Sequence, residues 1–306
     1  EIRLSLVGSE MCIRDSDTVN RQIPQHHKLA GLTVKTSNLC SEITLPTGKD
    51  REGNERTAVC CLSSLNIEKY DEWKDDKNFI EDIMRILDNV LTDFINKAPD
   101  SFANAKYAAA RERSVGLGVM GLHSYFQQKG IPFGSVMSKV WNKKIFALIQ
   151  KKVDQASKDL AEERGACPDA EEFGIKERFS NKTAIAPTAS ISIICGGASP
   201  GIEPIAANSY THKTLSGSYN VRNKYLAKLL EKHGKNTDEV WSSITTNQGS
   251  VSHLEFLTKE EKETFKTAFE IDQRWIVELG ADRTCLLYTS DAADEGLGVD
   301  LGGRRI

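Results

Sequence analysis

The chain has 306 residues, of which 39% are hydrophobic and 27% charged, and its formal net charge is −3. This balance is typical of a folded globular protein and argues against a disordered chain or a general nucleic-acid binder, which would normally be basic. No apolar run approaches the roughly 20 residues that a membrane-spanning helix needs. Seven cysteines without a Cys-x-x-Cys pair argue against a structural zinc site and favour reduced thiols in the cytoplasm.

The two ends, residues 1–16 and 285–306, do not look like parts of a natural protein. Codons for residues 11–15 have a reverse complement that, with a few added bases, encodes residues 285–290. We therefore expect both ends to be one sequencing-adapter-like element translated in opposite orientations, and we exclude them from fold reasoning. On this interpretation, residues 17–284 are an internal part of a longer protein.

Between these ends, extended and helical patterns alternate along the chain. The expected strands are 39–45, 56–65 and 182–186. The expected helices are 75–97, 135–164 (which stops at Gly165), 223–233, 258–269 with a Thr258/Glu261 capping box, and a stretch around Trp275. A polar turn is expected at 48–53 and a glycine-rich loop at 196–201. Long helices between short apolar strands favour an α/β architecture with largely parallel strands.

The segment 37–43 reads Ser-Asn-Leu-Cys-Ser-Glu-Ile and carries an amide, a thiol and a carboxylate at alternate positions. In an extended backbone alternate residues share a side, so Asn38, Cys40 and Glu42 would face one space. There an amide can bind a hydroxyl, a thiol can donate a hydrogen atom or a proton, and a carboxylate can act as a base. The same pattern also suits an ordinary strand with a buried cysteine and two exposed polar groups.

This segment, followed by Leu-Pro-Thr, resembles the active-site finger of the class I ribonucleotide reductase large subunits. The resemblance implies that Cys40 is the transient thiyl radical that takes the 3′ hydrogen of the ribose. It implies that Glu42 is the base for the 3′ hydroxyl and that Asn38 holds the ribose hydroxyls. Leu39 and Ser41 would complete this part of the substrate site.

A second segment, Ala-Val-Cys-Cys-Leu-Ser at 58–63, resembles a strand of the same family. The resemblance implies that Cys60 is one of two thiols that reduce the 2′ carbon and become a disulfide, with its partner upstream of residue 17. Cys61 would fall on the opposite face of the strand and pack. Without the resemblance, each would be interpreted as a buried core cysteine.

A third segment, Ala-Pro-Thr-Ala-Ser-Ile-Ser at 186–192, runs from a strand into turn-forming residues. Free N–H groups in such a turn can bind an anion, and an ordinary helix cap is the alternative. The segment resembles the family's substrate-phosphate loop, which implies that the substrate is bound by Pro187, Thr188, Ala189, Ser190 and Ile191.

Two further segments fit the family: Ser-Pro-Gly-Ile-Glu-Pro at 199–204, and Arg-Ser-Val-Gly-Leu-Gly-Val at 113–119. Gly116 and Gly118 would allow a strand and a helix to approach closely. They are not interpreted as a dinucleotide fingerprint, because the expected βαβ context is missing.

The resemblance covers nearly all of residues 17–284 and implies a partial ten-stranded α/β barrel with a central finger loop. The parent protein would reduce ribonucleoside diphosphates to deoxyribonucleotides, with no cofactor or metal bound directly. Its radical would come from a small subunit with a di-metal site of iron or manganese, and its electrons from thioredoxin or glutaredoxin. The large subunit would form a homodimer in the cytoplasm, bind ATP and deoxynucleotide effectors in regions outside this chain, and use neither a membrane nor a nucleic acid.

Three alternatives stay open. A class II, cobalamin-dependent reductase more often has Asn-Pro-Cys-Gly-Glu in its finger, so Leu39 and Ser41 favour class I. The fold could serve only to bind nucleotides, although the intact set of amide, thiol and carboxylate argues against a remnant. Cys40 could be an ordinary nucleophile, but none of the six histidines (His26, His27, His123, His212, His233 and His253) lies in a motif that suggests a base for it.

Overall fold

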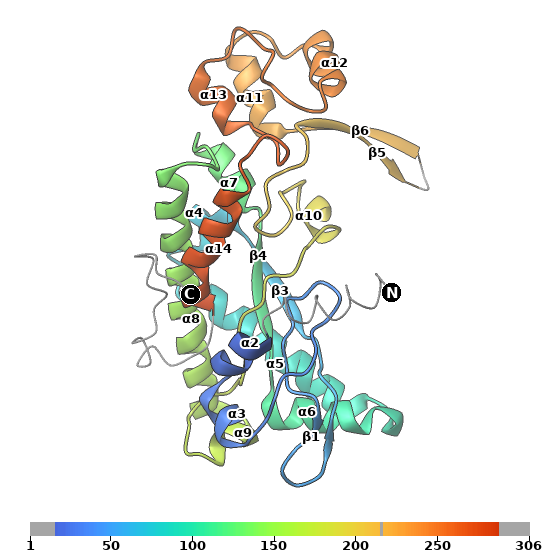
Figure 1. The fold of residues 1–306 in the computed structure, drawn as a ribbon, viewed down its shortest axis with the longest axis vertical. Helices are drawn as coiled ribbons and strands as arrows, with labels where there is room; N and C mark the ends of the chain where they lie inside the picture. The colour runs from blue at the N-terminus through green and yellow to red at the C-terminus, as the bar shows by residue number, and fades with distance from the viewer. Residues whose placement is uncertain (1–15, 215–216, 288–306) are drawn as a thin grey trace.

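The computed structural model describes residues 16–214 and 217–287 (Figure 1). Most of the two adapter-like ends expected from the sequence therefore lies outside the described residues. The described part is a mixture of helices and strands whose strands form three two-stranded sheets. These sheets do not close into a barrel. Within the described ranges, no helix is both long and apolar enough to cross a bilayer.

The centre of the molecule is a parallel pair of strands, β3 (Leu62–Asn66) and β4 (Gly116–Met120), with Leu62 opposite Gly116. A third segment follows the other edge of β4 through a parallel bridge between Leu117 and Thr183. This third segment lies very close, because a Cβ atom on Gly118 would overlap the carbonyl oxygen of Ala184. The predicted role of the glycine as a point of close approach is confirmed, although its neighbour is an extended segment and not a helix.

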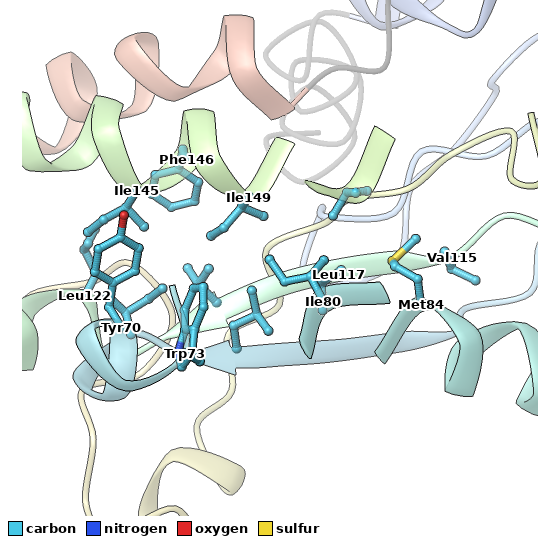
Figure 2. Close-up of a cluster of buried hydrophobic side chains, with 14 of the residues drawn as sticks. Tyr70, Trp73, Ile80, Met84, Val115, Leu117, Leu122, Ile145, Phe146 and Ile149 are labelled. Carbon is cyan, nitrogen blue, oxygen red and sulfur yellow. The ribbon is translucent and has the colours of Figure 1, made fainter. Parts of the chain in front are cut away.

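Two long helices cover this pair of strands and form the main core (Figure 2). Helix α5 (Phe79–Lys97) buries one apolar face, which includes Ile80 and Met84. Helix α8 (Val136–Arg164) contributes Ile145, Phe146 and Ile149, and the side chain of Ser135 caps its first turn. Helix α14 (Arg274–Leu287) packs along α8. Each large buried side chain contributes roughly 1.5–3 kcal/mol, so burial of these faces stabilises the helices more than their intrinsic propensities do.

The remaining elements of the main body are short. They are α2 (Ser16–Gln22), α3 (Gln25–Leu29), β1 (Gly48–Lys49), β2 (Glu55–Arg56), η1 (Ile67–Lys69), α4 (Tyr70–Trp73), η2 (Asp100–Phe102), α6 (Ala103–Glu112), α7 (Leu122–Gln128), α9 (Pro168–Glu171) and α10 (Ile191–Ile194). Strands β1 and β2 pair as an antiparallel hairpin, so the polar turn expected at 48–53 is confirmed at residues 50–53, while Gly48 and Lys49 belong to β1.

Residues 206–268 form a second unit, which we call the lobe, at one end of the molecule (Figure 1). It contains the antiparallel hairpin β5 (Ser209–Thr214) and β6 (Gly217–Arg222), and the helices α11 (Lys224–Lys232), α12 (Asp238–Thr246) and α13 (Lys259–Thr264). The three helices surround a separate hydrophobic core that includes Leu226, Leu230 and Trp241.

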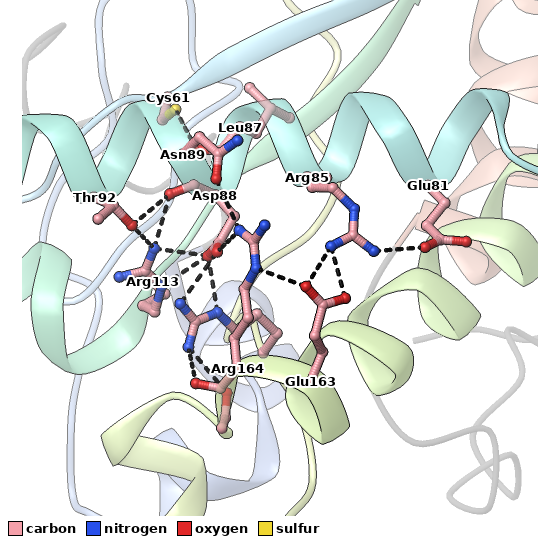
Figure 3. A network of polar contacts seen from close by, with 12 residues as sticks. Cys61, Glu81, Arg85, Leu87, Asp88, Asn89, Thr92, Arg113, Glu163 and Arg164 are labelled. Atoms are coloured by element: carbon pink, nitrogen blue, oxygen red, sulfur yellow. Dashed lines mark hydrogen bonds and ion pairs between the residues drawn. The ribbon is translucent and has the colours of Figure 1, made fainter.

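A buried ion-pair network joins α5 to α8 and to the end of α6 (Figure 3). Asp88 is fully buried and accepts hydrogen bonds from Arg113 at 2.7 Å, Arg164 at 2.8 Å and Arg178 at 2.9 Å. Burial alone would raise the pKa of Asp88, but the bonds from Arg178 and Arg164 and the charge of Arg113 hold it below its usual range. The carboxylate therefore stays ionised inside the protein.

The expected long helices are confirmed, with small shifts at their ends, and so is the capping box of Thr258 and Glu261. Three expectations are wrong in extent. The helix that starts at Thr258 ends at Thr264 and not near 269, and regular strand in 56–65 is limited to β2 and β3. The segment 182–186 forms a single bridge to β4, between Thr183 and Leu117, and the structure assigns no continuous strand there.

Candidate active site

The finger segment is a tight loop, so the extended strand expected at 39–45 is wrong. The side chain of Asn38 accepts a hydrogen bond from the N–H of Ile43 at 3.0 Å, and the N–H of Ser41 donates to the carbonyl of Asn38 at 3.1 Å. Ser41 has a φ of 69°, a left-handed conformation that reverses the chain. This reversal places Cys40 at the exposed tip of the loop. The neighbouring Leu39 is 93% exposed.

Cys60 lies just before β3 and interacts electrostatically with Cys40 and Glu42 of the finger loop. Partial burial of its sulfur raises the pKa of Cys60, and electrostatic interactions with Glu42 and Cys40 raise it further. Electrostatic coupling of this kind acts between groups that are near one another. A raised pKa keeps the Cys60 sulfur in its thiol form, so it retains a hydrogen to donate.

Cys61 occupies a different environment from Cys60. It is buried, and its sulfur lies 3.8 Å from the carbonyl oxygen of Leu87 on α5. Burial, with a contribution from Cys60, raises the pKa of Cys61 to about 11. The predicted packing role of Cys61 is therefore confirmed.

Glu42 lines a small cavity together with Val59, Ser114, Thr183 and Ala184. Its Oε2 atom is buried and accepts no hydrogen bond within the described part of the chain. A carboxylate oxygen that is shielded from water and has a free lone pair can accept a proton from a bound substrate. The finger and the segment that leads from Ala184 to Pro187 thus line the same cavity.

The turn at 187–191 is mostly exposed, with Thr188 as its buried member. Thr188 has a φ of 53°, and its hydroxyl accepts a hydrogen bond from the N–H of Gly201 at 2.7 Å. The Thr188 side chain therefore stabilises the turn itself. The exposed residues Pro187, Ala189, Ser190 and Ile191 form its surface.

Sequence reasoning missed a set of hydrogen bonds that join Ser199, in the loop after the turn, to the residues that follow β4. The N–H of Ser199 donates to the hydroxyl of Ser124 at 2.9 Å, and the N–H of Ser124 donates to the hydroxyl of Ser199 at 3.1 Å. The N–H of Gly121 also donates to the carbonyl of Ser199 at 2.7 Å. The two serines are far apart in the sequence, so no local pattern points to their contact.

Comparison with known proteins assigns the chain to a family. Residues 8–177 and 169–291 match the model of the ribonucleotide reductase barrel domain. The ribonucleoside-diphosphate reductase large subunit of Invertebrate iridescent virus 6 is 46% identical over 271 residues, which are 87% of this chain and 28% of that protein. The large subunit of Invertebrate iridescent virus 3 is 45% identical over 270 residues, 87% of this chain and 42% of that protein.

A solved structure agrees with these matches. The class Id ribonucleotide reductase alpha subunit of Actinobacillus ureae superposes with a TM-score of 0.81 and 39% identity, over 89% of this chain and 49% of that one. The chain thus spans less than half the length of each of these relatives. By both sequence and fold, it belongs to the ribonucleotide reductase family and corresponds to part of the barrel domain of the large subunit.

Proposed function

We propose that the large subunit containing these residues reduces ribonucleoside diphosphates to 2′-deoxyribonucleoside diphosphates by thiyl-radical chemistry. The observation that carries the proposal is the electrostatic coupling of Cys60 to the finger-tip thiol Cys40 and to Glu42, one carboxylate oxygen of which is buried where Glu42 lines a cavity. Family membership supports the same assignment.

In the proposed reaction, a radical at the Cys40 sulfur takes the 3′ hydrogen of the ribose while Glu42 removes the proton of the 3′ hydroxyl. The 2′ hydroxyl then leaves as water. Cys60 and a second thiol, expected from another part of the large subunit, supply two electrons and two protons and become a disulfide. Cys40 finally returns the hydrogen to the 3′ carbon, so the net change is one ribonucleotide and two thiols to one deoxyribonucleotide, one disulfide and water.

The remaining site residues have binding roles in the proposal. Asn38 would hold the ribose hydroxyls through its amide N–H₂, because its carbonyl oxygen is already bonded to Ile43. Leu39 and Ser41 would flank the sugar at the finger tip. The substrate diphosphate would rest on the exposed turn 187–191, where backbone N–H groups bind oxygen anions.

The proposed partners follow from class I, the class to which the solved relative from Actinobacillus ureae belongs. A small subunit with a di-iron or di-manganese site would generate the radical, and thioredoxin or glutaredoxin would reduce the disulfide. The large subunit would act as a homodimer in the cytoplasm and be regulated by ATP and deoxynucleotides outside these residues. The barrel would be ten-stranded, with residues 38–43 as its central finger.

Replacement of Cys40 by serine in the full-length large subunit tests the radical role. A serine O–H bond is too strong to exchange a hydrogen atom with a ribose C–H bond, so turnover should fall to background. Substrate affinity, measured by equilibrium binding, should stay within about twofold, because the variant keeps a small polar side chain at the same position. A near-normal rate of turnover would show that Cys40 does not carry the radical.

A further inference from the structure

Lys224, the first residue of α11, connects three parts of the molecule. Its ammonium group lies 2.7 Å from Oε2 of Glu68 in η1 and 2.9 Å from the carbonyl oxygen of Gly196. Glu68 follows β3 in the main body, Lys224 belongs to the lobe, and Gly196 lies just after α10. One side chain therefore ties the lobe both to the end of the central strand pair and to the loop that follows the candidate phosphate turn.

The Glu68 end of this contact is firmly placed. Glu68 is 6% exposed, and its N–H donates to the side chain of Asn66, the last residue of β3, at 3.0 Å. Its Oε1 atom is buried and has no hydrogen-bond partner among residues 16–214 and 217–287. A buried carboxylate needs a compensating cation, and Lys224 supplies one.

The Lys224 end also has a rigid base. Asn223 caps α11 by accepting hydrogen bonds from the N–H groups of Tyr225 and Leu226. Its side-chain N–H₂ donates to Gln127 of α7 at 2.9 Å and to Asn208 at 2.8 Å. The first turn of α11 is thus bonded to the main body immediately before Lys224.

The third end, Gly196, is linked to the candidate phosphate turn by the backbone. The N–H of Cys195 donates to the carbonyl oxygen of Ile191 at 2.8 Å, and the N–H of Ala198 donates to the carbonyl oxygen of Ser192 at 3.0 Å. The N–H of Ser192 in turn donates to Thr188 at 3.0 Å. Because these hydrogen bonds make residues 188–198 one compact segment, a bond that holds the Gly196 carbonyl also limits the movement of Thr188.

We propose that Lys224 is a positioning residue that fixes segment 188–198 for binding of the substrate diphosphate, so that the lobe contributes to substrate affinity. This inference rests on the proposed function, because it takes residues 187–191 as the phosphate-binding turn. Lys224 acts through the turn and needs no contact with the substrate or the reacting atoms.

The test compares three variants of the full-length large subunit. In Lys224→Met, KM for a ribonucleoside diphosphate should rise about tenfold, equivalent to ~1.4 kcal/mol, while kcat stays within about twofold. Lys224→Arg should restore most of the affinity, because its several donors can reach both acceptors. Lys228→Met is the matched control: Lys228 is exposed one turn further along α11, and its ammonium lies 5.8 Å from the centre of the Tyr225 ring. It should leave KM unchanged.

Hydrogen exchange of the amides in 188–198 tests the positioning role of Lys224 separately from the phosphate-binding role of residues 187–191. Exchange should become faster in Lys224→Met and stay unchanged in Lys228→Met. If exchange is unchanged in Lys224→Met, Lys224 does not position the segment and the inference is wrong. If exchange becomes faster but KM does not move, the inference also fails, and the fault lies in the phosphate role given to the turn. Equal effects of both methionine variants would indicate a general charge effect and would overturn the positioning role.

Discussion

Cys60 and Cys61 are adjacent in the chain, yet their sulfurs lie in different environments. The Cys60 residue is exposed and couples electrostatically to Glu42 and Cys40, whereas Cys61 is buried against α5. The alternation of side chains in extended backbone explains this difference. Because Cys60 is exposed and couples to the finger while Cys61 packs against α5, the two residues form a natural pair for mutagenesis.

Substitution of each cysteine by alanine in the full-length large subunit should separate chemistry from packing. Cys60→Ala should reduce multiple-turnover activity with a dithiol reductant to background, because one electron-donating thiol is lost. Cys61→Ala should retain turnover and lower the free energy of unfolding by about 1 kcal/mol, as is usual for a small buried deletion. Steady-state assays and urea unfolding would measure both effects. Loss of turnover in Cys61→Ala with retention in Cys60→Ala would reverse the assignment.

The same alternation rule succeeds at residues 60 and 61 but fails at the finger. There it predicted that Asn38, Cys40 and Glu42 share one side of a strand, whereas the segment folds into a loop. The left-handed conformation of Ser41 and the bond from Ile43 to the Asn38 side chain cause the reversal. Serine has no special preference for this conformation, so composition alone could not reveal it. Which of these residues meet the substrate stays a prediction of the family resemblance, which does not depend on local backbone geometry.

At the scale of elements, the long helices are well predicted because each carries a continuous apolar face. Helix α5 shows what such a pattern leaves out: its buried face includes the charged residue Asp88. The carboxylate is compensated by Arg113, Arg164 and Arg178, which come from other parts of the chain. Hydrophobic periodicity by itself groups Asp88 with the charged residues of the exposed face, because the arginines that compensate it come together only after the elements have assembled.

Replacement of Asp88 by asparagine should destabilise the fold strongly. The variant keeps the shape of the side chain but leaves three arginines without their shared carboxylate, which should cost on the order of 3–5 kcal/mol. Asp93→Asn on the same helix is the control, because Asp93 pairs only at the surface with Lys97 and its loss should have little effect. Urea unfolding at pH 7 measures both, and equal stabilities of the two variants would contradict the role of the network.

The pH dependence of stability provides an independent check on Asp88. Because its pKa is lowered in the folded protein, the group stabilises the fold above its unfolded pKa of about 4. This contribution is lost as the pH falls from that value through the folded pKa. The difference in unfolding free energy between the wild type and Asp88→Asn should therefore shrink below pH 4, and a difference that grows on acidification would contradict this sign.

At the scale of the whole molecule, the described residues leave an apolar groove beside the central strand pair. The groove has a volume of about 470 Å³ and runs between α5 and β3. On α5, Ile86 and Val90 are 58% and 52% exposed along it. Within residues 16–214 and 217–287, β3 has a hydrogen-bonded neighbour on one side, β4. Closure of a barrel could not be predicted from hydrophobic periodicity, because it depends on which strands pair with the outer edges of the sheet. This chain spans less than half the length of each relative, so some of those strands need not be in it.

The chain printed above should therefore self-associate when it is produced alone. An open strand edge beside exposed apolar side chains favours pairing between molecules. Size-exclusion chromatography with light scattering should show oligomers, and the double variant Ile86→Lys, Val90→Lys should shift them toward monomer. Val136→Lys on α8, which replaces another exposed apolar residue, should not. A monodisperse wild-type monomer would contradict this expectation.

The lack of a side chain at Gly118 affects the position of the turn that begins at Pro187. Residues 182–186 lie against β4 at a separation that admits a hydrogen atom and excludes a methyl group. From this narrow seam the chain continues directly to Pro187 and the turn beyond it. The distance between β4 and the start of the proposed phosphate-binding turn therefore depends on the absence of a side chain at Gly118. Alanine at 118 would therefore displace Ala184 and Ile185 from β4, and with them the start of the turn, although the sequences of the finger and the turn stay unchanged.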